Sequence, residues 1–460
     1  MIIKVVGKLR VVAALAVALP CLAAGWQRVQ TPQIEILTDS GEKVGLATLL
    51  RLEQIRGVFA TPDPRPFALR VFLFNSEKEF RDYADNSTTA GFYQSSVERD
   101  FIVLHAGAGL TRAAAHEYVH LIMDRGSGSL PLWFEEGTAE LYSNLEFQRG
   151  RLLAGEPIRE HLTKLATEKW LTAGELIGAN KVSALYNERT LSGVFYAESW
   201  ALVHMLNLAP GWREKIPRFA ELLASGRDGN DAFPEVFGKS IDQALTELHG
   251  YMSHLRVAAL DAPPLAKEET VTVDSLSPMD GTLARADLAL QVQHVELARR
   301  LFQEAQKTAP DSAAAEAGLG ALALAEDRRE EARLHLERAI ARGSRDGATF
   351  FQLAMLKREQ GAPVDDLLRR VIKLDPNFGQ AHFLLGVEAS DAGDYEEAIE
   401  HLQAATRAMP RKSYAWHALA YAQTKLGRIG EARASVSRAL RTADTVQEEQ
   451  MAEALLSSLN

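Results

Sequence analysis

The spacing of hydrophobic and polar residues divides the 460-residue chain into regions of different character. In residues 26–106, QIEILTD and RPFALRVFLFN have the composition of strands, and EKVGLATLLRLEQIRGVFA between them has apolar residues at helical spacing. AGFYQSSVERDFIVLHAG predicts a hairpin whose second arm runs from Phe101 to His105. Residues 110–260 are dominated by helical patterns that Gly and Pro interrupt. We therefore predict an α+β domain over residues 26–260, with a small mixed sheet near its start.

The segment 261–281, DAPPLAKEETVTVDSLSPMDG, is rich in proline and acidic residues and predicts a linker. Beyond it, residues 282–460 repeat a pattern. Four leucines, each followed by Gly or Ala, recur at intervals of 34, 32 and 34 residues: Leu319, Leu353, Leu385 and Leu419. A second series keeps the same register: Ala298, Ala332, Ala398 and Ala432, with Val364 at the position that is missing. Three units close with a proline: Pro310, Pro376 and Pro410.

This period, with small residues where two helices meet and a closing proline, resembles the tetratricopeptide repeat (TPR). The unit 379–412, GQAHFLLGVEASDAGDYEEAIEHLQAATRAMPRK, fits best. The resemblance implies an all-α TPR superhelix of about four repeats from about 283 to 444, the first degenerate in its leading helix. The last segment, TADTVQEEQMAEALLSSLN, would be the capping helix, and the groove would hold a protein partner or substrate. An irregular helical bundle would have to produce the same register by chance.

Composition and charge narrow the possible partners and the compartment. With 47% hydrophobic and 24% charged residues the chain is typical of a soluble globular protein. A formal net charge of -10, without a concentrated basic face, argues against nucleic acid as a partner. Residues 1–24 combine Lys4, Lys8 and Arg10 with the apolar run VVAALAVALPCLAA, which is the layout of a signal peptide cleaved near Ala23 or Ala24.

That apolar run is shorter than the roughly 20 residues of a spanning helix. We therefore expect an exported protein, periplasmic or secreted, with no transmembrane span after signal cleavage. The single cysteine, Cys21, lies inside the leader, so the mature chain would have neither disulfides nor thiolate ligands. Any bound metal must then be held by histidine and carboxylate side chains.

One short motif carries the candidate chemistry. Residues 113–125, AAAHEYVHLIMDR, place His116 and His120 four positions apart, on one face of a helix, so both imidazoles can be directed at one point. Glu117 lies ~100° round the helix from His116, where a base can take a proton from a metal-bound water without ligating the metal. Taken alone, the motif also fits a buried structural helix.

The next segment supplies a third ligand. DRGSGSLP predicts a turn and LPLWFEEGTAELYSNLEF a second helix, and fifteen residues separate His120 from Glu136. A tight reversal between antiparallel helices would return Glu136 to the two imidazoles. Two histidines and one glutamate leave the fourth tetrahedral position open for water, which is the catalytic arrangement of zinc.

HEYVH followed by WFEEGTAE resembles the gluzincin zinc peptidases, particularly the peptidase MA-like bacterial group and, more distantly, aminopeptidase-N-like enzymes. The resemblance implies a zincin-like α+β catalytic domain with Glu136 as third ligand and Glu135 pointing elsewhere. It also implies that Glu140 holds a ligand histidine, although Glu140 could equally be a solvated helical carboxylate. The strand DFIVLHA would bind extended substrate, or be an ordinary core strand. The motif by which aminopeptidases select a free N-terminus is not visible.

Two later residues are further candidates. Tyr196 would supply the phenol that stabilises an oxyanion, or else pack a helix against the core. Glu198 is a rival third ligand, but the families that take a ligand from a distant helix have an acidic residue four positions on, where this chain has Leu202. We treat His105, His204 and the remaining histidines as structural or exposed.

The resulting hypothesis is an exported zinc metallopeptidase with one zinc ion per chain, held by His116, His120 and Glu136. Zinc would lower the pKa of bound water to roughly 7 and polarise the scissile carbonyl, and Glu117 would act as the base. The alternative is an exported TPR binding scaffold whose peptidase-like domain is inactive. Because the ligand and base positions are all intact, the peptidase hypothesis is preferred.

Overall fold

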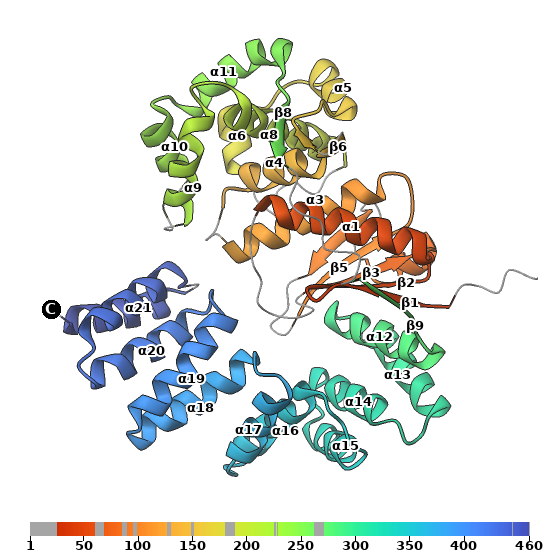
Figure 1. Ribbon diagram of the computed structural model, residues 1–460. Helices are drawn as coiled ribbons and strands as arrows, with labels where there is room; N and C mark the ends of the chain where they lie inside the picture. Colours follow the sequence, from red (N-terminus) through yellow and green to blue (C-terminus); the bar gives the residue numbers. More distant parts are fainter. Residues whose placement is uncertain are drawn as a thin grey trace, which may run out of the picture.

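The computed structural model describes residues 25–59, 69–84, 90–94, 99–126, 130–148, 151–179, 189–224, 227, 229–261, 271–443 and 445–459. The predicted leader, residues 1–24, lies outside this set. Within the described residues, no helix has both the length and the apolar character needed to cross a bilayer. The chain forms a sheet-containing N-terminal part and a C-terminal array of helices (Figure 1).

The predicted small mixed sheet is confirmed, and it has six strands in the order β4-β5-β3-β2-β1-β9. Their bounds are β1 Gln27–Gln30, β2 Ile34–Thr38, β3 Leu69–Phe74, β4 Gly91–Gln94, β5 Asp100–His105 and β9 Thr272–Ser275. β2, β3 and β5 are parallel, whereas β4, β1 and β9 run antiparallel to their neighbours. The expected hairpin over residues 90–107 is the antiparallel pair β4–β5.

Helices α1 (Glu42–Phe59) and α3 (Leu110–Gly126) cover one face of this sheet. Alternate residues of β3, namely Leu69, Val71 and Leu73, are buried in the core that these helices share with the sheet. The residues between them belong to the other face, because successive side chains of a strand point to opposite sides. Both faces are buried, as expected for strands whose sequences are almost continuously apolar.

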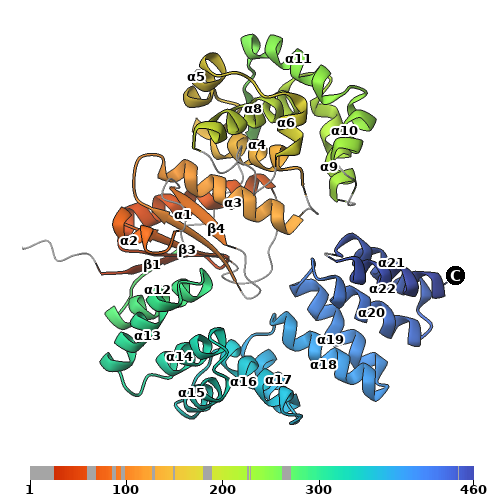
Figure 2. The same cartoon turned by 180° about the vertical axis from the view of Figure 1, so that it is seen from behind.

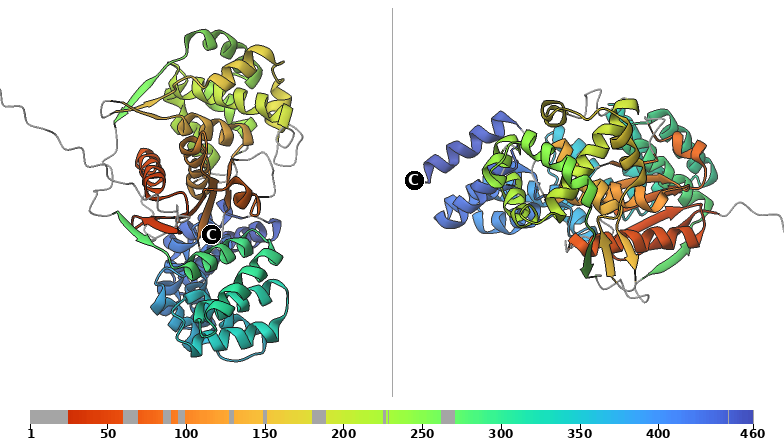
Figure 3. Two further views of the ribbon diagram at one scale, coloured as in Figure 1. Left: turned by 90° about the vertical axis from the view of Figure 1, so that its right-hand side faces the viewer. Right: turned by 90° about the horizontal axis from the view of Figure 1, so that it is seen from above.

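The opposite face is covered by the first two helices of the C-terminal array, α12 (Pro278–Gln291) and α13 (Val295–Thr308). Phe72 and Phe74 of β3 share one core with Ala286 and Phe302. Polar contacts fix the same interface, since Arg285 of α12 pairs with Glu79 of the short helix α2 (Glu77–Arg81) at 2.6 Å. The sheet is therefore a layer between the α1 and α3 side and the array (Figures 1 and 3).

The linker prediction for residues 261–281 is wrong at its C-terminal end. Residues 272–275 are strand β9, which pairs antiparallel with β1, and helix α12 begins at Pro278 after the N-cap Ser277. β9 is the outermost strand and is mostly exposed, so it gives only a weak hydrophobic signal, and the prolines and acids around it dominated the sequence pattern. Residues 262–270 of the predicted linker lie outside the described part of the chain.

A second, mostly helical unit follows α3. Its helices are α4 Leu132–Ser143, α5 Arg159–Thr167, α6 Ala173–Gly178, α8 Arg189–Leu208, α9 Ile216–Ala224, α10 Gly229–Phe237 and α11 Ile241–Tyr251. A three-stranded sheet of β6 Glu146–Gln148, β7 Arg151–Ala154 and β8 Ala258–Asp261 completes it. Helix α8 lies at its centre, with Phe195 and Trp200 fully buried in one large core.

The C-terminal array continues as antiparallel helix pairs that follow an arc (Figures 1 and 2). After α12 and α13 come α14 Ala313–Ala325, α15 Arg329–Ala341, α16 Gly347–Glu359, α17 Asp365–Leu374, α18 Gly379–Ala392, α19 Tyr395–Ala408, α20 Ser413–Lys425, α21 Ile429–Arg441 and α22 Val446–Ser458. The described residues thus contain five pairs and the final helix α22, where the periodic leucines predicted about four repeats. The predicted span, from about 283 to 444, includes α12–α13, so the count was one repeat short. The degenerate leading helix is α12, where Arg285 stands 34 residues before Leu319 and contacts the sheet-containing part.

Candidate metal centre

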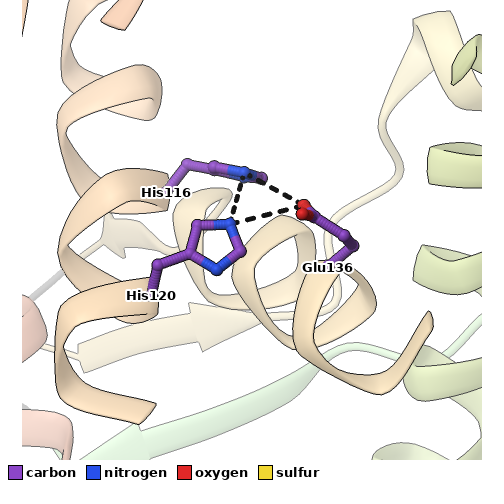
Figure 4. A group of neighbouring side chains, drawn as sticks. All are labelled: His116, His120 and Glu136. Carbon is purple, nitrogen blue, oxygen red and sulfur yellow. Dashed lines mark hydrogen bonds and ion pairs between the residues drawn. The ribbon is translucent and has the colours of Figure 1, made fainter. Parts of the chain in front are cut away.

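Helices α3 and α4 pack against each other and bring three predicted side chains together (Figure 4). His116 and His120, one turn apart on α3, have their Nε2 atoms 3.0 Å apart. Oε2 of Glu136, on α4, lies 3.4 Å from Nε2 of His116 and 3.3 Å from Nε2 of His120. Each residue thus contributes one potential ligand atom to a single triangle.

The triangle has the dimensions of a metal site. Ligand bonds of about 2.0–2.1 Å to a tetrahedral zinc ion imply ligand atoms about 3.3–3.4 Å apart. Glu136 is only 1% exposed, and no donor among the described residues makes a hydrogen bond of good geometry to its Oε2. Because each of the three side chains can direct a lone pair at the same point, the set could hold a divalent cation.

Carboxylates also stand behind both imidazoles. Oε1 of Glu135 lies 3.3 Å from Nδ1 of His120, and Oε1 of Glu140 lies 3.6 Å from Nδ1 of His116. A carboxylate on the far nitrogen orients a histidine and raises its basicity as a ligand. Glu140 thus lies beside His116, and Glu135, which is outside the triangle of potential ligand atoms, lies beside the far nitrogen of His120.

Glu140 is itself held by two residues that the sequence pattern did not select. Its Oε2 lies 3.0 Å from Nε2 of His161, on α5, and it forms an ion pair with Arg112, on α3. Burial works against the charge of Glu140, but the hydrogen bond from His161 and the positive charge of Arg112 hold its pKa at about 2. Nothing in the spacing of His161 could have identified it, because only the packing of α5 against α8 brings it to α3.

Glu117, the predicted base, points toward the edge of the sheet. Its carboxylate accepts a hydrogen bond from the backbone N–H of Tyr93 in β4. Burial raises the pKa of Glu117, and the neighbouring imidazoles of His116 and His120 oppose that rise. β4 is the outermost strand on this side of the described sheet, while β5 lies between β3 and β4. The strand DFIVLHA is therefore a core strand, and β4 is the strand that borders the site.

The two candidates on α8 lie in different surroundings. The ring of Tyr196 is 6.5 Å from the ring of His116, so Tyr196 belongs to the wall of the cluster. Glu198 is fully buried and accepts a hydrogen bond of 2.6 Å from the backbone N–H of Leu171. Burial without a charged partner raises the pKa of Glu198 to about 8. The rival third ligand is thus engaged at Leu171, and it is not part of the cluster.

A glycine beside Glu136 sets how closely α4 approaches α8. A Cβ atom on Gly137 would lie 2.2 Å from the backbone oxygen of Ser199 and 2.6 Å from Cγ2 of Val203. Only glycine permits this separation, which lets α8 pack directly behind the helix that presents Glu136. The Glu-Gly sequence of the motif therefore has a packing cause.

Of the other histidines, His204 is fully buried and structural. Its Nε2 lies 3.0 Å from the carbonyl oxygen of Gly155 and its Nδ1 2.9 Å from the hydroxyl of Tyr251. Burial lowers its pKa, so the neutral ring donates to Gly155 and accepts from Tyr251. His105 packs its ring against Phe80, 5.3 Å away between ring centroids.

The similarities to known proteins lie in the C-terminal array of helices. Two family models, both described as tetratricopeptide repeat, match residues 283–347 and 389–457. The C-terminal part of the chain consists of tetratricopeptide repeats. In the TPR array the small residues work as expected: a Cβ atom on Gly386 of α18 would lie 2.6 Å from Cγ of Leu402 in α19. The paired helices approach closely at these positions.

Solved structures give low-scoring similarities. YrrB, described as a TPR protein with an unusual peptide-binding site, is 20% identical, with 38% of this chain and 91% of YrrB covered and a TM-score of 0.31. MamA is 18% identical over 36% of this chain and 91% of its own, with a TM-score of 0.29. PilF of Pseudomonas aeruginosa is 17% identical over 39% and 88%, with a TM-score of 0.34. No curated protein matches the chain.

Proposed function

We propose that residues 26–260 form a gluzincin-type zinc peptidase that hydrolyses peptide bonds, in an exported protein whose TPR array holds a protein partner or substrate. The observation that carries the proposal is the triangle formed by His116, His120 and Glu136, with 3.0–3.4 Å between its ligand atoms. The sequence around it supports the same proposal, since HEYVH and WFEEGTAE supply the ligands and the base together.

The roles of the residues follow from their positions. A zinc ion held by His116, His120 and Glu136 would lower the pKa of coordinated water to roughly 7 and polarise a carbonyl. Glu117, next to the imidazoles and tied to Tyr93, takes a proton from water and delivers it to the leaving amine. Tyr196 is the candidate donor to the developing oxyanion. Glu135 and Glu140 hold the imidazoles in the orientation that directs both Nε2 atoms at the cluster.

The position of β4 suggests how substrate lies in the site. Because Tyr93 of β4 contacts Glu117, a peptide extended along β4 would carry its scissile bond past the base. Backbone pairing with a strand recruits substrates with little dependence on their side chains. This points to cleavage within extended or unfolded polypeptides.

The test uses purified mature protein and two substitutions. We expect His116→Ala to lose zinc, measured by metal analysis, because one of three protein ligands is removed. We expect Glu117→Gln to retain zinc and to hydrolyse an unfolded protein substrate about 10²–10⁴-fold more slowly, because it removes the general base. Glu168→Gln, an exposed position on the surface, is the matched control and should behave like the wild type.

Two outcomes contradict the proposal. Wild-type hydrolysis by the Glu117→Gln protein would exclude the mechanism. Zinc retention with no cleavage of any unfolded substrate by the wild-type protein would favour the alternative, an inactive peptidase-like domain in an exported TPR scaffold.

A further inference from the structure

Two histidines of the TPR array lie against each other, far along the chain from His116 and His120. His382 of α18 and His401 of α19 have their Nδ1 atoms 3.0 Å apart and their ring centroids 5.2 Å apart. On α18 the ring lies one helical turn before Gly386, and on α19 it directly precedes Leu402. Those two residues hold the helices close together, because a Cβ atom on Gly386 would lie 2.6 Å from Cγ of Leu402. The rings therefore meet inside a close helix contact, and pushing them apart would open the repeat.

The surroundings determine which nitrogen of each ring carries a proton. Nε2 of His382 lies 3.1 Å from the carbonyl oxygen of Pro376, which can only accept a hydrogen bond, so we assign a proton to this nitrogen. Nδ1 of neutral His382 is then an acceptor, and Nδ1 of His401 donates to it. Neutral His401 consequently has no proton on Nε2, which lies 3.8 Å from Oε1 of Glu397.

The two rings can take up one proton without losing this contact, but not two. The first proton goes to Nε2 of His401, on the side of Glu397, and leaves the bond between the rings intact. The second proton can only go to Nδ1 of His382, which is the acceptor of that bond. Two N–H groups would then face each other across 3.0 Å, each on a positively charged ring.

Neighbouring charges do not offset this repulsion. Glu397, beside His401, is shared with Arg369, which lies 2.8 Å from it. Burial lowers the pKa of His382 and of His401, and the nearby carboxylates do not restore either value. Charged groups of three segments act on the rings: Arg369 of α17, the C-cap Asp375 of α17, and Glu397, Glu400 and Arg407 of α19.

The sign of the pH dependence follows from these lowered pKa values. The unfolded chain, in which histidine has a pKa of about 6.5, binds more protons than the folded repeat at mildly acidic pH. Stability is therefore complete above about pH 6.5 and is lost as the pH falls below that value.

We propose that His382 and His401 form an acid-sensitive latch, which closes the repeat of α18 and α19 at neutral pH and lets it open when both rings are protonated. Helices α18 and α19 lie between α17 and α20. An open latch therefore loosens the connection of α20, α21 and α22 to the rest of the array. The latch requires neither a bound metal nor peptidase activity.

Hydrogen exchange of the full chain, followed by mass spectrometry at pH 7.5 and pH 5.0 in EDTA, tests the latch. Exchange times are scaled to the intrinsic rate at each pH, so that the remaining differences report opening of the structure. Excluding the protonated form of one histidine from the closed repeat makes opening about 30-fold more frequent at pH 5.0. We therefore expect protection of residues 379–408 to fall at least about 10-fold between the two pH values.

A second repeat provides an internal control. In α14 and α15, His335 lies 2.6 Å from the carboxylate of Glu316, which can pair with a protonated ring. Protection of residues 313–341 should therefore be the same at both pH values.

Two substitutions that keep the hydrogen bond but remove one titrating ring locate the effect. In His382→Asn the side-chain oxygen can accept from Nδ1 of His401, and in His401→Asn the side-chain amide can donate to Nδ1 of His382. Each should abolish the loss of protection at pH 5.0. His254→Asn, which removes an exposed histidine outside the array, is the matched control and should lose protection like the wild type.

Two outcomes overturn the proposal. One is equal protection of residues 379–408 at both pH values in the wild type. The other is a loss at pH 5.0 that persists in the Asn variants, because another group would then cause the opening. If one Asn variant does not fold, the other decides.

Discussion

Gly137→Ala tests whether the packing of α4 against α8 holds Glu136 in place. The substitution adds one methyl group at a point where the added carbon would lie 2.2 Å from the carbonyl oxygen of Ser199 and 2.6 Å from its carbonyl carbon. Both atoms are backbone of helix α8, so no side-chain rotation relieves the contact. Nonbonded heavy atoms are stable near 3.5 Å, and α4 must therefore move away from α8 by about 1 Å.

The size of the effect follows from this displacement. Overpacking a tightly packed core costs about 1–3 kcal/mol of unfolding free energy, and contact with rigid backbone places Gly137→Ala at the upper end of that range. The same movement displaces Glu136, the preceding residue, relative to His116 and His120. A misplacement of about 1 Å in a reactive constellation costs up to roughly 10²-fold in activity.

Urea unfolding and a zinc competition assay with a chromophoric chelator measure the two effects. The matched control is Gly250→Ala in α11, where an added Cβ meets nothing within 4 Å. The control should be neutral or about 0.5–1 kcal/mol more stable, because alanine loses less backbone entropy on folding. If Gly137→Ala is as stable as Gly250→Ala and binds zinc like the wild type, the close helix approach does not position Glu136.

Three further substitutions test other parts of the structure. Burial raises the pKa of Glu198 to about 8, so the wild-type protein loses stability as the pH rises from about 4.5 to about 8. Glu198→Gln should remove this loss, which amounts to about 3–5 kcal/mol when urea unfolding is compared at pH 4 and pH 9. The same pH dependence in both proteins would contradict the prediction. Glu140→Gln should weaken zinc binding about 10–100-fold in chelator competition, because the carboxylate that orients the imidazole of His116 is lost. An unchanged zinc affinity would show that Glu140 does not orient His116. Gly386→Val should destabilise the TPR array by about 1–3 kcal/mol, because the added side chain would collide with Leu402. Gly430→Ala, which has open space around the added carbon, should leave the stability unchanged. Unfolding curves give the free energy of unfolding of both variants.

Local patterns along the chain were sufficient to predict most helices and strands and the HEYVH motif. Hydrophobic spacing predicted β2, α1, β3 and the β4–β5 hairpin, and the 34-residue period predicted the repeats, because each depends on residues close in sequence. The same holds for His116, Glu117 and His120, which share one helical turn. The pattern failed where a residue serves a distant contact. At Arg285 the leucine of the repeat signature is replaced by a residue that pairs with Glu79, and the predicted number of repeats was therefore one short although their span was right.

By itself, then, the sequence determined which side chains could ligate a metal and which helices and strands carry them, since periodicity and spacing are properties of neighbouring residues. Only the tertiary structure decided which residues surround the histidine cluster and hold its side chains. His161 and Arg112 reach Glu140 only because α5 and α3 pack around α4 and α8, and β4 rather than β5 borders Glu117 because strand order is set by pairing between distant segments. A cavity between the sheet and the array likewise exists only because the array packs onto the sheet, since Arg99 and Asp287, which both line it, are distant in the chain.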